Sequence, residues 1–181
     1  MKTTNKITLV SIAGALALVG VAFAAWQFNA SASKASAGNV EITKKTSVGS
    51  IADVTTFYLT LDQSGAYWTN KSFDDSEDAI TNEDKVSTFE FVYTGSASAN
   101  DVSDVTLEVS YVVDSGIATY VNVTGGELGV ATESANVKSA TYTLPTLSYT
   151  SAKPSTSAEF DAMKAALEGK KVTFTLTATV A

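Results

Sequence analysis

The sequence predicts an all-β fold with one helix: a single-domain antiparallel β-sandwich of the jelly-roll kind. Three observations predict it. Short segments rich in Thr, Val and Tyr show an alternation of apolar and polar residues. Gly, Asn and Asp residues separate these segments at regular intervals. Only one segment, near the C-terminus, has the spacing of an amphipathic helix. Many short strands in one chain of this length are typical of sandwiches and jelly rolls.

The clearest strand candidates have an apolar residue at every second position. Residues 171–180 alternate Val, Phe, Leu and Ala with Thr, and residues 88–94 and 105–113 show the same alternation. Each of these segments is therefore expected to bury one face. The other strand candidates, in chain order, are residues 39–43, 54–61, 118–123, 140–144 and 147–150, with a turn at 62–65.

A helix is predicted over residues 157–168. Thr156 and Glu159 have the spacing of a capping box, in which each side chain satisfies a backbone N–H of the first helical turn. Gly169 is suited to end the helix. The apolar face of this helix consists of Phe160, Met163 and Leu167. We expect the helix to pack across one end of the sheets.

Residues 1–25 have the features of a cleavable secretory signal. Lys2 and Lys6 precede nineteen residues without a charge, and small residues then form an A-x-A cleavage pattern at Ala22, Ala24 and Ala25. A second such triplet lies at 30–32. The alternative is an uncleaved membrane anchor, because nineteen apolar or small residues are long enough to span a bilayer. With cleavage, the protein is secreted and meets a membrane only through its uncleaved signal.

Removal of residues 1–25 from the 181-residue chain leaves 156, enough for one domain with an ordinary core. We expect residues 26–38 to form an N-terminal strand with a flexible connection, and residues 39–181 to form the sandwich. Loss of Lys2 and Lys6 changes the formal net charge from −7 to −9. An acidic surface without Arg repels phosphate, so nucleic acid is not an expected partner.

The residue types that are missing exclude several kinds of chemistry. The sequence has no His and no Cys. Nucleophilic catalysis by Ser-His-Asp or Cys-His systems is therefore excluded, as is zinc held by His or Cys. No pair of carboxylates stands out as a glycosidase site. We expect no enzyme, no cofactor and no resident metal.

One dense acidic run contains Asp74, Asp75, Glu77 and Asp78. Carboxylate oxygens are suitable calcium ligands, which makes this run a weak calcium-loop candidate. Its spacing does not follow the D-x-[DN]-x-[DN]-G pattern of a calcium loop. The pattern therefore favours a solvated loop.

The segment after the signal alternates large and small apolar residues with polar ones. Its apolar side consists of Trp26, Phe28, Ala30 and Ala32. It can be the first strand of the chain's own sandwich, which the pattern alone favours, or a strand that completes a neighbour's sheet, since sheet edges accept other chains.

Two stretches resemble the start of TasA/camelysin-type secreted proteins: Ala24-Ala25-Trp26-Gln27-Phe28-Asn29 and Ala35-Ser36-Ala37-Gly38-Asn39-Val40-Glu41-Ile42. The predicted helix and final strand are also similar to the C-terminal end of that family, so the resemblance covers about a third of the chain. It implies a jelly roll that serves as a biofilm-matrix or cell-surface fibre subunit, joined to its neighbours by donor-strand complementation. Some relatives are classed as metalloproteases, but without His this chain has no H-E-x-x-H motif.

The leading interpretation is a secreted subunit of an extracellular or biofilm-matrix filament, which binds copies of itself and further matrix components. Residues 26–38 would supply its donated strand and the flexible connection that follows. One alternative is a monomeric cell-surface adhesin or carbohydrate-binding module that uses loops such as 62–87. Another is a pilin-like subunit that assembles through a retained hydrophobic N-terminus.

We expect the secreted protein to begin at Ala25 or Trp26, because the A-x-A pattern ends there. Mass spectrometry of the intact protein from the culture medium checks this. A chain that retains residues 1–24 would exclude strand donation from a freed terminus and would favour the pilin-like alternative.

Overall fold

The computed structural model describes residues 35–46, 48–62, 64–73, 80–96, 102–151 and 154–180. Five strands form a first sheet: β1 (Ala35–Thr46), β3 (Tyr58–Leu61), β4 (Ala66–Thr69), β6 (Val105–Val113) and β12 (Lys171–Val180). A second sheet contains β2 (Ser50–Ile51), β5 (Thr88–Thr94), β8 (Glu127–Leu128), β9 (Thr132–Ser134) and β10 (Val137–Thr143). The remaining elements are β7 (Val121–Thr124), β11 (Thr146–Tyr149), α2 (Ser115–Tyr120) and α3 (Ser157–Leu167).

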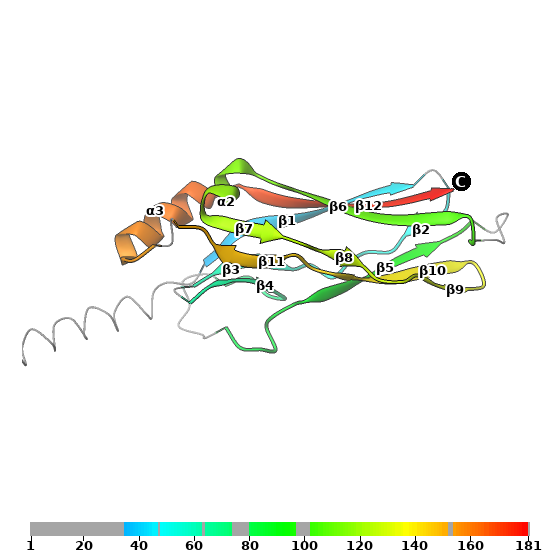
Figure 1. Cartoon of the computed structure of the whole chain (residues 1–181), viewed down its shortest axis with the longest axis horizontal. Coiled ribbons are helices and arrows are strands. Elements are labelled where there is room, and N and C mark those ends of the chain that lie inside the picture. Colours follow the sequence, from blue (N-terminus) through cyan, green and yellow to red (C-terminus); the bar gives the residue numbers. More distant parts are fainter. Residues whose placement is uncertain are drawn as a thin grey trace, which may run out of the picture.

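The two sheets form the two layers of a sandwich, and both helices lie at one end of it (Figure 1). The strand order is β4-β3-β1-β12-β6 in the first sheet and β2-β5-β10-β8 in the second, where β9 also pairs with β10. A small sheet of β11 and β7 lies toward the helices. This architecture confirms the predicted all-β sandwich.

β12 lies between β1 and β6 and joins the two ends of the described chain. It pairs antiparallel with β6 along the whole of both strands, from Val172 opposite Val113 to Val180 opposite Val105. Its pairing with β1 is parallel, beginning with Asn39 beside Lys171. The first sheet is therefore mixed, which the predicted purely antiparallel sandwich did not include. A parallel pair needs a long connection, and here nearly the whole chain supplies it.

The core lies between the two layers and centres on Phe174 of β12, which is completely buried. The alternation predicted for this strand is confirmed, because Val172, Phe174, Leu176 and Ala178 point inward. Five aromatic rings surround Phe174 with centroids 5.7 to 6.2 Å away: Phe57, Trp68, Phe89, Tyr111 and Tyr142. These rings come from both layers, so one side chain connects the two sheets.

Two hydrogen bonds tie the layers together on the side of β4 and β11. Trp68 of β4 donates its indole N–H to the carbonyl oxygen of Pro145 at 2.7 Å. Tyr149 of β11 donates its hydroxyl to the carbonyl oxygen of Asp62 at 2.6 Å. The outer edge of β4 is also covered, because Val86 donates its backbone N–H to Trp68.

Helix α3 forms where the sequence predicts it, and its capping box is present. Thr156 Oγ1 accepts a hydrogen bond from the backbone of Glu159, and the Glu159 carboxylate accepts one from the backbone of Thr156. Gly169 follows the helix with a φ of 71°, a conformation that favours glycine. The buried face consists of Phe160, Met163 and Leu167, as expected.

Four predicted segments differ from the structure. Residues 35–38, expected as part of a flexible connection, form the start of β1, because they pair with β3 from Ala35 opposite Leu61 to Gly38 opposite Leu59. Residues 118–120, expected as the start of a strand, belong to helix α2, because the first turn of this helix hydrogen-bonds to the Asp114 carbonyl and buries Ile117 completely. Residues 54–57 lie outside the sheets although Phe57 is buried, so the strand expected over 54–61 is only β3. β4 occupies part of the region expected as loop, because Trp68 pairs with Leu59 and enters the core.

We expect Phe174→Ala to lower the free energy of unfolding by about 3–5 kcal/mol, because it leaves a cavity among five rings. Urea unfolding followed by circular dichroism measures this. Val130→Ala is the control, since Val130 is 94% exposed, and we expect it to change stability by less than about 0.5 kcal/mol. Equal stabilities of the two variants would contradict a core centred on Phe174.

Candidate functional site

The predicted site residues lie outside the described residues. This applies to the cleavage residues Ala22, Ala24 and Ala25, to the assembly residues Trp26, Phe28, Ala30 and Ala32, and to the acidic residues Asp74, Asp75, Glu77 and Asp78. The structure does describe the surfaces that border these segments: the start of β1 at Ala35 and the residues on either side of the acidic run.

The residues that flank the acidic run are held together by Asp84. Its carboxylate accepts hydrogen bonds from the backbone N–H and hydroxyl of Thr81, and it pairs with the Lys71 ammonium at 2.9 Å. The hydrogen bond from Lys71 is the main reason that the pKa of Asp84 falls to about 2, and the bonds from Thr81 add to it. Within the described ranges, no three carboxylates come close enough to hold a metal ion.

The longest strand edge without a partner in the described chain belongs to β6. One side of β6 pairs with β12, and none of the described strands pairs with the other side. Hydrogen bonds of an antiparallel pair alternate along the strand. Asp114 donates its backbone N–H to Lys171, so residues 106, 108, 110 and 112 also direct their backbone groups to β12. Residues 107, 109, 111 and 113 direct theirs to the opposite side, which we call the free edge of β6. The N–H of Val105 instead donates to the carbonyl oxygen of Val102 at 3.1 Å.

The same odd-numbered residues point their side chains into the sandwich, and their burial decreases along β6. Val105 is 3% exposed and Leu107 is 9% exposed, whereas Val109, Tyr111 and Val113 are only half-buried. Val123, whose carbonyl oxygen accepts a hydrogen bond from the Tyr111 hydroxyl at 3.4 Å, is also half-buried. The half of the free edge toward the helices therefore leaves core-facing apolar side chains incompletely covered.

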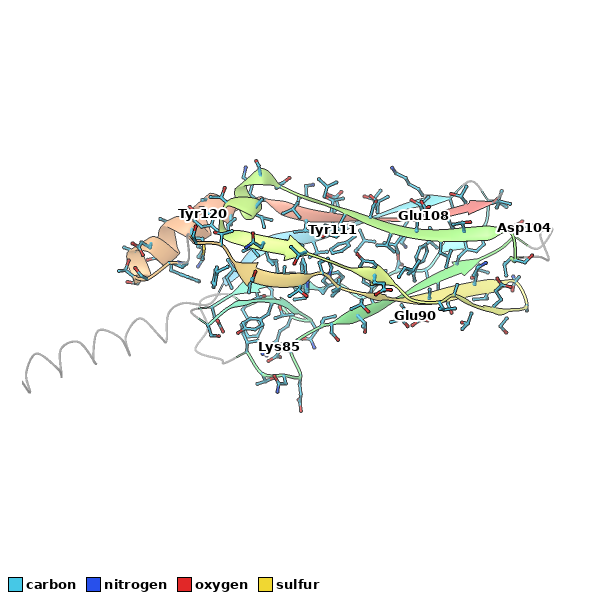
Figure 2. All side chains as sticks on the ribbon, viewed as in Figure 1. Lys85, Glu90, Asp104, Glu108, Tyr111 and Tyr120 are labelled. Atoms are coloured by element: carbon cyan, nitrogen blue, oxygen red, sulfur yellow. The ribbon has the colours of Figure 1, made fainter. Side chains whose placement is uncertain are left out.

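Tyr111 connects β6 with the chain after β7 (Figure 2). Its hydroxyl donates to the carbonyl oxygen of Gly125 at 3.1 Å, and its ring lies 5.7 Å from that of Phe174. At the other end of β6, the Lys138 ammonium donates to the carbonyl oxygens of Val102 and Ser103. The layers are thus tied before the start of β6 and at Tyr111, and the half-buried residues Val109 and Val113 lie on either side of the Tyr111 tie.

The polar side of β6 is acidic. Asp104 and Glu108 are exposed near its start, and neither forms an ion pair with a cation of the described ranges. Figure 2 shows both residues along β6, away from the helices. An uncharged segment meets no like-charge repulsion at this edge.

A second partly unpaired edge belongs to β5. β2 pairs only with Tyr93 and Thr94, and beyond Val92 the irregular residues 53–57 border β5 and form a groove with it. The core-facing side chains of β5 are already covered: Phe89 is 8% exposed, and Phe91 and Tyr93 are almost completely buried. This edge therefore has backbone groups for another strand but little uncovered core.

A groove of about 520 Å³ lies between β4 and the β10–β11 connection, in the region expected to contain binding loops. Its aromatic side chains are Tyr67 and Trp68. The Lys85 ammonium lies 4.4 Å from the centre of the Tyr67 ring, and Trp68 is only 5% exposed. Lys85 therefore covers one face of the Tyr67 ring, and Trp68 is too buried for a sugar to stack on it.

Comparison of the chain with protein-family models, curated proteins and solved structures gives no match. In the described part of the chain, no helix is long and apolar enough to span a bilayer. The sequence correctly predicts β6 as a half-buried strand, but its alternation does not reveal that one edge lacks a partner. The strand order and the decreasing burial of its apolar residues in the fold identify that edge.

We expect Asp84 to make the fold sensitive to acid. Because its pKa in the folded state lies below the ordinary value of 3.8, ionised Asp84 stabilises the fold above that pH, and the contribution is lost as the pH falls toward about 2. Asp84→Asn should be less stable than the wild type at neutral pH and should lose less stability across this interval. Urea unfolding at neutral pH, pH 3.8 and near pH 2 measures both effects.

Asp161→Asn is the matched control, because Asp161 is an exposed carboxylate of α3 and the substitution removes the same charge. We expect its stability at neutral pH to equal that of the wild type. Parallel losses of stability in the wild type and Asp84→Asn would contradict the role of Asp84.

Proposed function

We propose that the protein is a secreted, non-enzymatic subunit of an extracellular or biofilm-matrix filament, and that it polymerises when its N-terminal segment enters the sheet of a neighbouring subunit. The observation that carries this proposal is the free edge of β6, where unpaired backbone groups and half-buried apolar side chains occur together. An added strand would satisfy both, since it supplies hydrogen bonds and covers apolar surface.

The N-terminal segment has the chemistry that such an edge requires. Its uncharged residues 25–33 match the nine-residue length of β6, and its apolar residues recur at every second position. Burial of Trp26 and Phe28 contributes at most roughly 4–6 kcal/mol, from which the cost of association must be deducted. Signal cleavage would produce the free terminus that donates, so export and assembly would be coupled.

The start of β1 supports donation to a neighbour over pairing within the same subunit. β1 is separated from the free edge by β12 and β6, so a segment that leaves β1 would have to cross three strand spacings, roughly 14 Å. At roughly 3.3–3.6 Å per residue, the crossing would use about four residues and leave too few to cover β6. The segment of another subunit needs no such crossing.

We expect the double variant Trp26→Ser/Phe28→Ser to be secreted as a folded monomer, because it removes both apolar anchors and leaves the described fold unchanged. Negative-stain electron microscopy and light scattering measure assembly, and thermal unfolding checks the fold. The matched control, Gln27→Ser/Asn29→Ser, changes the polar side of the same segment and should form filaments like those of the wild type.

Deletion of residues 25–33 tests directly whether this segment is the donated strand. Filaments of the deletion variant would exclude strand donation by this segment. A wild-type protein that stays monomeric at high concentration would instead favour the adhesin alternative. N-terminal sequencing of each variant shows that its signal has been cleaved at the same residue.

A further inference from the structure

We infer that the donated segment binds the free edge of β6 in an antiparallel direction, with Trp26 opposite Tyr111 and Ala32 opposite Val105. This inference rests on the proposed function, and it identifies the acceptor strand, the direction of pairing and the register. Four properties of β6 lead to it: the position of its two ends, the burial of its side chains, the orientation of its backbone groups and its charge.

The direction follows from where the strands begin and end. β1 begins at the end of the sandwich that carries α3, and β6 ends there, since Val113 pairs with Val172 just after α3 (Figure 1). The N-terminal segment therefore leaves its own subunit at the α3 end. In a filament of identically oriented subunits, it enters the next subunit at the opposite end, where β6 begins. Its residues then run antiparallel to β6, with Trp26 reaching farthest toward α2.

The sizes of the side chains match this direction. Ala32 and Ala30 would lie against Val105 and Leu107, which are already buried and leave room only for small residues. Phe28 and Trp26 would lie against Val109 and Tyr111, which are half-buried. The reverse direction would place the two aromatic residues at the closed end and the two alanines at the open end.

The backbone orientation also fits the segment. Residues 107, 109, 111 and 113 of β6 direct their side chains into the core and their backbone groups to the free edge, whereas Val105 has its side chain in the core and its N–H bonded to Val102. Directly opposite residues of paired strands lie on the same face, so Trp26, Phe28, Ala30 and Ala32 must each be opposite an odd-numbered residue. The inferred register meets this condition at all four positions. It also places Asn29 opposite the exposed side chain of Glu108.

Both ends of the freed segment carry a positive charge. The side chains of residues 25–33 are uncharged, Lys34 follows them, and signal cleavage would add a free amine at the other end. In the inferred register Ser33 is opposite Asp104, so Lys34 would follow directly beside this exposed carboxylate. The reverse direction would bring the free amine, rather than Lys34, to Asp104, so this carboxylate favours a cationic donor end and the direction itself rests on the strand ends and the side-chain sizes.

Engineered disulfides test the acceptor strand, because the chain has no cysteine of its own. Asn29 and Glu108 would form a non-hydrogen-bonded pair, in which Cα atoms lie about 4.5 Å apart and a disulfide fits. We expect filaments of Asn29→Cys/Glu108→Cys to give a ladder of covalent oligomers on non-reducing gels. The matched variant Asn29→Cys/Glu90→Cys places the second cysteine on the exposed face of β5 (Figure 2) and should give none.

Two further pairs of double-cysteine variants test the direction of pairing. If the donated strand ran parallel to β6 with Asn29 still opposite Glu108, the residues before and after Asn29 would exchange their partners on β6. Antiparallel pairing predicts ladders for Gln27→Cys/Ser110→Cys and Ser31→Cys/Thr106→Cys. Parallel pairing predicts them for the exchanged combinations, Gln27→Cys/Thr106→Cys and Ser31→Cys/Ser110→Cys. The single-cysteine variants show how much dimer arises from random contact.

The outcomes separate this inference from the proposed function. Three outcomes would overturn β6 as the acceptor while leaving filament assembly intact. They are filaments that crosslink through position 90 only, through positions 90 and 108 equally, or through neither position. Ladders only in the exchanged combinations would overturn the antiparallel direction. A crosslinked monomer, or a wild-type protein that forms no filaments, would overturn the proposed function itself.

Discussion

The packing of Phe174 against rings from both layers is the contact on which the fold depends most. β12 carries this residue and is hydrogen-bonded to β1 on one side and to β6 on the other, so it holds both strands in the first sheet. The chain has no cysteine, which leaves apolar packing and backbone hydrogen bonds to hold the sheets together. The two ends of the described chain thus meet at the centre of one sheet, and β1 begins at the α3 end of the sandwich.

The position of β12 also determines which edge stays open. On the side of β4, backbone bonds from residues 84–86 and the Trp68–Pro145 hydrogen bond close the sandwich. On the side of β6, the described chain provides only the ties at Lys138 and Tyr111. An uncovered edge with half-buried apolar residues promotes association, and a sequence usually blunts it with charge. The exposed carboxylates of Asp104, just before β6, and of Glu108 in β6 lie on the outward face, so they leave the apolar inward face open to an added strand.

A filament built in this way would use the same physical forces within and between subunits. Strand pairing and burial of alternate side chains hold β6 to β12, and the proposed donor would repeat both on the other side of β6. The subunit would fold first because its core is complete around Phe174. The donated strand would then cover only the half-buried side chains at the free edge of β6. Export would precede assembly, because the donor has a free end only after signal cleavage.

The sequence by itself determined the strands that alternate and the helix that carries its own cap, because these depend on neighbouring residues. Residues 88–94, 105–113 and 171–180 are strands with the predicted bounds, and Thr156 and Glu159 start α3 as their spacing predicts. Only the tertiary structure decided where local preference was weak or misleading. Residues 115–120 became a helix because Ile117 enters the core, and Trp68 drew its segment into a strand beside β3. The parallel β1–β12 pair and the unpaired edge of β6 were likewise decided there, because a strand's alternation specifies which face it buries but not which strands lie beside it.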